Sequence, residues 1–119
     1  MILTEEKFIE LGEKYGLDIE KAPHIIPKLK GSMLWYNFPD YNPNDTHFWF
    51  IEFETATQKI QYADGFAYNP YARRIIGEHL KEKDCVTVEE LEEILKDSLQ
   101  QFKECKSKIE LENVSKDFD

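Results

Sequence analysis

The sequence predicts a single α+β domain with the element order α-β-β-β-(β)-α-α, in which a small antiparallel sheet carries helices on one face. Apolar residues recur at helical spacing near both ends of the chain, whereas strand-like alternation and aromatic residues fill the middle. Residues that favour turns separate the alternating segments at short intervals. At 119 residues the chain can build one core but not two. We expect residues 1–112 to form this domain and 113–119 to be a frayed tail.

The first helix is predicted over about residues 5–15. Thr4 is a typical N-cap, acidic residues fill the first turn, and Gly16 favours a left-handed stop. The following segment, 17–32, contains two prolines that exclude a regular helix. We therefore expect an ordered but irregular, extended connector there.

Three strands are predicted in the middle of the chain, and a short fourth one is left open. Each is bounded by turn residues, and Asp64-Gly65 indicates a tight turn before the last of them. The predicted ranges are 33–38, 46–55, 58–63 and, for the fourth, 66–68.

Two further helices are predicted after the strands. Asn69 followed by Pro70 is typical of a helix start and predicts a helix that ends near Lys83. Thr87 opens a capping box, and the apolar stripe that follows predicts a long helix ending near Lys108.

The densest aromatic run of the chain, residues 47–54, has two different strand faces. One face is wholly apolar and is expected to pack on the last helix: Trp49, Ile51 and Phe53. The other face is mixed: Phe48, Phe50, Glu52 and Glu54. Because aromatic rings need cover and carboxylates need water, the mixed face favours a partner with both apolar and cationic character.

The chain is acidic, with 24 Asp and Glu against 15 Lys and Arg and a net charge of −9. Direct binding to a nucleic acid is not expected, because it needs clustered Lys and Arg. A basic partner protein is favoured instead, although the excess carboxylates could simply keep the protein soluble. The predicted partner-binding residues are Asp40, Asp45, Phe48, Phe50, Glu52, Glu54 and Asp64.

Arg73 and Arg74 are the only arginines of the chain. A guanidinium can bind a carboxylate or phosphate through two parallel hydrogen bonds, so we consider the pair a candidate anion anchor. The alternative is an internal ion pair, for example between Arg74 and Glu78.

No pattern in the sequence predicts catalytic residues, a metal site or a cofactor. The run that begins at Asp40 imitates a calcium-binding loop, but Asp45 and Ile51 occupy the places of its essential glycine and glutamate. The three histidines and two cysteines share no ligand spacing, and no glycine-rich loop precedes a helix. We therefore do not expect an enzyme.

Cys85 and Cys105 bracket most of the predicted last helix, which would hold them about 30 Å apart. A disulfide is excluded at that distance, and reduced thiols favour the cytoplasm. The first residues lack the pattern of a signal peptide, and no apolar run is long enough to span a membrane. We expect a cytoplasmic protein without membrane contact.

The first functional hypothesis is an acidic protein–protein interaction module that inhibits a basic partner protein, with nucleic-acid-binding proteins among the candidate partners. In outline, a small acidic domain of this element order resembles phage-encoded inhibitors of defence proteins (anti-CRISPR proteins among them), and also bacterial immunity proteins. The resemblance implies no site residue, because no motif matches residue by residue. Two alternatives stay open. One is a ligand-binding or enzymatic domain with a site near residues 23–27 that uses His47 and Arg73 or Arg74. The other is a structural subunit of a larger assembly or a homodimer through the aromatic face.

Overall fold

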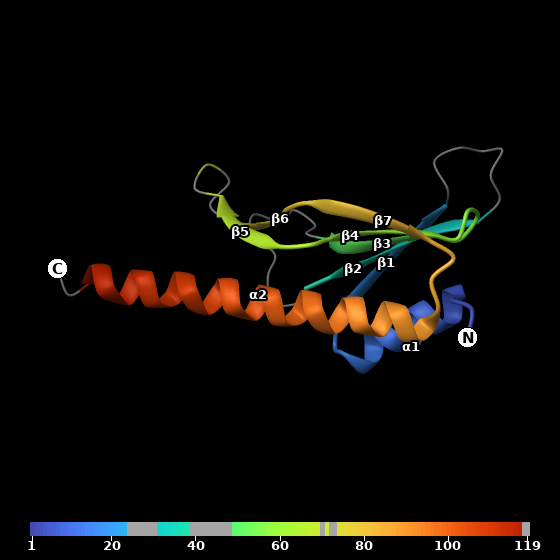
Figure 1. Ribbon diagram of the computed structural model, residues 1–119, viewed down its shortest axis with the longest axis horizontal. Helices are drawn as coiled ribbons and strands as arrows, with labels where there is room; N and C mark the ends of the chain where they lie inside the picture. The colour runs from blue at the N-terminus through green and yellow to red at the C-terminus, as the bar shows by residue number, and fades with distance from the viewer. Residues whose placement is uncertain (24–30, 39–48, 70, 72–73, 118–119) are drawn as a thin grey trace.

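The computed structural model describes residues 1–23, 31–38, 49–69, 71 and 74–117, without the side chains of residues 69, 74 and 109–117. The described elements are two helices and seven strands (Figure 1). In chain order they are α1 (Glu5–Lys14), β1 (Asp18–Pro23), β2 (Ser32–Asn37), β3 (Trp49–Glu54), β4 (Lys59–Ala63), β5 (Phe66–Asn69), β6 (Arg74–Gly77), β7 (Leu80–Asp84) and α2 (Val88–Asp117). The α+β class is confirmed, but the order of elements differs from the predicted one.

Five strands form one antiparallel sheet in the order β1-β2-β3-β4-β7. The predicted strands are confirmed as β2, β3, β4 and the short β5, except that residues 46–48 lie outside the described part of the chain. The first strand of the sheet, β1, was not predicted. Its residues alternate weakly and stay largely exposed because β1 is an edge strand, so the pairing with β2 rather than an apolar pattern holds it in place.

The strands β4 to β7 form one long hairpin. Lys59 lies opposite Asp84, and seven residues further along each strand Phe66 lies opposite Gly77, so the register does not change between the two pairs of strands. The backbone hydrogen bonds continue across the bend between them, where Glu78 N–H donates to Gly65 O at 2.9 Å. The outer part of this hairpin, β5 and β6, leaves the sheet as a two-stranded ribbon (Figure 1).

The prediction of a helix from Asn69 to near Lys83 is therefore wrong. The chain reverses between Asn69 and Arg74 and returns as β6 and β7. Asn and Pro are favoured in chain reversals between strands as well as at helix starts, so the sequence pattern was ambiguous. Asp64-Gly65, which we expected to be a turn, is the bend inside the hairpin, and Gly65 has a φ of 136° there.

The two helices begin as predicted. Thr4 Oγ1 accepts a hydrogen bond from the backbone N–H of Lys7, and Thr87 Oγ1 accepts one from the N–H of Glu90. α1 ends before Gly16, which has a φ of 70°. α2 is longer than expected, because its backbone stays helical to Asp117, past Lys108 and through most of the tail predicted to fray.

A β-bulge decides which side chains of β3 face the helices. Tyr36 pairs with Ile51 but Asn37 pairs with Trp49, so Phe50 is an extra residue in β3. Phe50 is consequently fully buried beside Ile51, whereas Trp49 shares the other face with Asn37 and is only partly buried. The predicted placements of Phe50 on the outer face and of Trp49 in the core were wrong. The prediction assumed that side chains alternate regularly along the strand, and the bulge interrupts that alternation.

Both helices lie on the same side of the sheet (Figure 1). The ring of Phe8 in α1 stacks on Tyr36 with centroids 3.9 Å apart, and Phe102 in α2 stacks on Phe38 at 3.8 Å. α1 can approach the sheet this closely because Gly12 has no side chain. A Cβ at this position would lie 2.6 Å from the Tyr36 ring. The core predicted from both long elements is otherwise confirmed, since the following are buried: Ile51, Phe53, Leu91, Leu95 and Phe102.

Candidate functional site

The structure separates the residues that we expected to form one acidic surface. Glu52 and Glu54 lie on the sheet face away from the helices, Phe50 is buried on the opposite face, and Asp64 points toward α2. The other predicted site residues are not described, apart from the backbone of Arg74 in β6: Asp40, Asp45, Phe48, Arg73 and the Arg74 side chain. His47 and the connector residues 24–27 also lie outside the described part.

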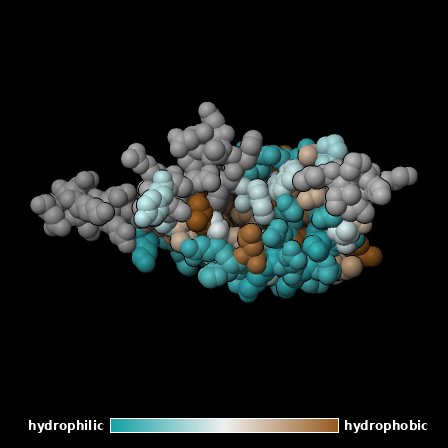
Figure 2. All heavy atoms as spheres, turned by 90° about the horizontal axis from the view of Figure 1, so that it is seen from above, coloured by the Kyte–Doolittle hydropathy of each residue, from teal (hydrophilic) through white to brown (hydrophobic). Residues whose placement is uncertain are grey.

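We use the term open face for the side chains that the strand register places opposite the helices. Its charged and aromatic members are Asp18, Glu20, Trp35, Trp49, Glu52, Glu54, Lys59, Glu82 and Asp84. Among the described residues of this face, six carboxylates thus stand against one lysine. Figure 2 looks onto this side and shows hydrophilic residues over most of the described surface, with a few hydrophobic ones between them.

Hydrogen bonds hold several of these side chains in fixed positions. Trp35 Nε1 donates to Glu52 Oε2 at 2.8 Å across the β2–β3 pair. Asn37 Nδ2 donates to Glu20 Oε1 at 3.3 Å across the β1–β2 pair. Glu20 and Glu52 therefore present their charges in a defined arrangement on the sheet.

Lys59 lies at the first position of β4, between the strands β3 and β7. In the register it is opposite Glu54 of β3 and opposite Asp84 of β7, and its Nζ is 3.7 Å from Glu82 Oε2. Lys59 and Glu82 have side chains that are 41% and 57% exposed, so water screens this ion pair and weakens it.

Asp64 belongs to a different environment on the helix side. Its carboxylate is 2.6 Å from Lys81 Nζ. The hydrogen bond and the charge of Lys81 lower the pKa of Asp64, and a hydrogen bond from Gln101 of α2 contributes. The alternation of side chains along β4 explains why Asp64 points to the helix side, because it follows Ala63 of the open face. We had expected Asp64 to lie in a turn instead.

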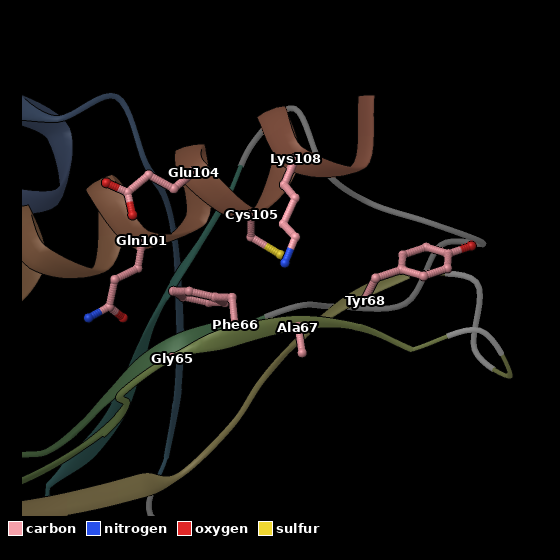
Figure 3. A pocket seen from close by; sticks show the side chains of 8 residues that line it. All are labelled: Gly65, Phe66, Ala67, Tyr68, Gln101, Glu104, Cys105 and Lys108. Carbon is pink, nitrogen blue, oxygen red and sulfur yellow. The ribbon is translucent and has the colours of Figure 1, made fainter. Parts of the chain in front are cut away.

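A groove that the sequence did not indicate lies between β5 and α2 (Figure 3). Its volume is about 480 Å³, and it is open to solvent on one side. The described residues that line it are Gly65, Phe66, Ala67, Tyr68, Gln101, Glu104, Cys105 and Lys108. The groove arises where the ribbon leaves the sheet and α2 continues past it (Figure 1), and this arrangement was not predicted.

The remaining candidate chemistry is limited. Cys85 and Cys105 are free thiols, as expected, and burial raises the pKa of Cys105. Within residues 1–23, 31–38, 49–69, 71 and 74–117, no group of three or more His, Cys, Asp or Glu side chains is arranged to hold a metal ion. None of the described helices is long and apolar enough to cross a lipid bilayer.

Comparisons of the chain with protein-family models, with curated proteins and with solved structures found no match.

Proposed function

We propose that this protein is a protein–protein interaction module that binds a basic partner protein through its open face. One observation carries the proposal: the register of five strands gathers six carboxylates around Trp35 and Trp49, with Lys59 as the one lysine among the described residues of that face. A negative field over a rigid surface accelerates encounter with a positive partner and discourages acidic ones.

In this proposal Trp35 and Trp49 provide the aromatic contacts of the open face, in place of the buried Phe50. Trp35 and Trp49 are partly buried on the open face, so each ring keeps some surface for a partner. Tryptophan is enriched among the residues that contribute most to binding at interfaces, and an indole face also attracts guanidinium groups. Acidic side chains beside aromatic ones favour arginine-rich protein surfaces over apolar ones.

Within this class we propose an inhibitor whose partner binds nucleic acid. A surface that attracts a phosphate backbone is positive, and the open face would compete for it by the same electrostatic attraction. The support for this finer proposal is charge complementarity.

The test compares two double substitutions that each remove two negative charges. Glu52→Gln with Glu54→Gln changes the open face, and Glu93→Gln with Asp97→Asn changes exposed positions of α2 on the helix side. The probe is a fluorescent deca-arginine peptide, whose affinity is measured by anisotropy between 20 and 150 mM salt. We expect the open-face variant to bind about tenfold more weakly and with a flatter salt dependence, and the α2 variant to change about twofold.

Equal losses in the two variants would show that net charge rather than the open face governs binding, and would overturn the proposal. Affinity purification with the wild type and both variants as bait extends the test to natural partners. A partner of the proposed kind is retained by the α2 variant, lost by the open-face variant and released by added double-stranded DNA.

A further inference from the structure

The groove between β5 and α2 has an apolar wall that its own packing keeps in place. The Phe66 ring meets Phe102 edge to face at 5.6 Å and is thereby fixed to the core. Tyr68, two residues further along β5, lies on the same side of the ribbon and is 46% exposed. Cys105 of α2 faces these rings across the groove (Figure 3).

The α2 wall of the groove carries a lysine, Lys108, in a chain whose net charge is −9. Among the described residues, the other charged one that lines the groove is Glu104. Figure 3 shows the amine of Lys108 beside the sulfur of Cys105, with both directed toward β5. The carboxylate of Glu104 accepts a hydrogen bond from Gln100 Nε2 at 3.0 Å, on the helix surface.

We propose that this groove binds a small amphiphilic anion, a molecule with an aromatic or aliphatic body and one carboxylate or sulfonate. The body packs against Phe66, Tyr68 and Cys105, and the anionic group pairs with Lys108 Nζ. The volume of about 480 Å³ lies within the range of small-molecule sites. This site is separate from the open face and does not depend on the function proposed above.

The aromatic wall and the Lys108 amine together favour an amphiphilic anion as the ligand. A purely apolar molecule would make no use of the Lys108 amine at the mouth of the groove. A small inorganic anion would leave the aromatic wall exposed to water. An amphiphilic anion satisfies both, because it buries its body and keeps its charged group at the partly wet rim.

The first experiment measures binding of 8-anilinonaphthalene-1-sulfonate by fluorescence and its displacement by dodecanoate. Lys108→Gln should weaken binding about fivefold or more, the effect of losing one charged hydrogen bond. Lys106→Gln removes the same charge from an exposed position of α2 that does not line the groove, and should change binding less than twofold. Equal effects of the two variants, or no displacement by dodecanoate, would overturn the proposal.

The second experiment uses the two free thiols, since Cys85 is exposed and lies outside the groove. Saturating dodecanoate should slow alkylation of Cys105 by iodoacetamide at least threefold and leave Cys85 unchanged, as read by peptide mass spectrometry. Cys105→Phe should fill the groove and abolish binding, with an unchanged near-ultraviolet circular dichroism spectrum as the check on folding. Equal protection of both thiols, or full binding by a folded Cys105→Phe variant, would place the ligand elsewhere.

Discussion

The two faces of the sheet are built from the same strands but from different side chains. On the helix side, β3 contributes Phe50, Ile51 and Phe53, all fully buried. On the open face, the same strand contributes Trp49, Glu52 and Glu54, all partly exposed. Apolar character alone therefore does not determine which face of the sheet a side chain of β3 occupies, since Trp49 is larger than Phe50 and still lies on the open face. The bulge at Phe50 makes the difference.

The largest effect is expected from truncating the two aromatic residues next to each other in β3. Phe50→Ala should reduce the free energy of unfolding by about 3–5 kcal/mol, because it leaves a cavity between Tyr36 and Phe38. Trp49→Ala should cost about 1–2 kcal/mol, because that side chain is only partly buried. Urea unfolding of both variants measures the difference. The reverse ranking would mean that β3 alternates regularly and has no bulge.

A smaller effect is expected on the open face itself. Trp35→Phe removes the indole N–H that donates a hydrogen bond to Glu52, and should reduce the free energy of unfolding by about 1 kcal/mol. It should also weaken binding of the deca-arginine peptide, because Glu52 loses the bond that fixes its position. Trp49→Phe makes the same truncation on the same face and serves as the control. Equal losses in both variants would show that the Trp35–Glu52 hydrogen bond contributes nothing specific.

The smallest effect is expected at the Asp64–Lys81 pair on the helix side, and it depends on pH. Because Lys81 lowers the pKa of Asp64 in the folded state, the pair stabilises the protein above the unfolded pKa of about 4. This contribution is lost as the pH falls through the lower folded pKa. Asp64→Asn should therefore be less stable than the wild type at pH 6, and the gap should narrow toward pH 3.

Urea unfolding of the wild type and Asp64→Asn at several pH values between 6 and 3 measures that gap. Lys81→Gln removes the other partner and should show the same trend. A gap that stays constant over this range would show that the pair does not titrate as its geometry implies.

Local sequence patterns were sufficient to predict a helix or strand wherever that element depends mainly on its own residues. Thr4 and Thr87 identified both helix starts, because a capping side chain bonds to the N–H three residues later. The turn residues on either side identified β2 and β4, because such residues favour the ends of strands. In the same way, Leu91, Leu95 and Phe102 were assigned to the core from their spacing on one helix.

The hairpin of β4 to β7 shows where local patterns fail. Asn69 and the proline after it are as favourable in a chain reversal as at a helix start, so only the pairing of both arms decides between them. β7 has five exposed residues and no apolar alternation, and the backbone hydrogen bonds to β4 define it. Such pairing joins residues far apart in the chain, and no window of neighbouring residues contains it.

The candidate site was predicted in composition and not in arrangement. The sequence determined that the protein is acidic, that it has one core and that Glu52 and Glu54 share a strand face, because charge, length and the two-residue period are local properties. The tertiary structure alone decided that Phe50 is buried, that Asp64 turns toward α2 and that Trp35 holds Glu52. It also created the groove lined by Lys108 and Tyr68, since a hollow between a ribbon and a helix exists only once both are placed in space.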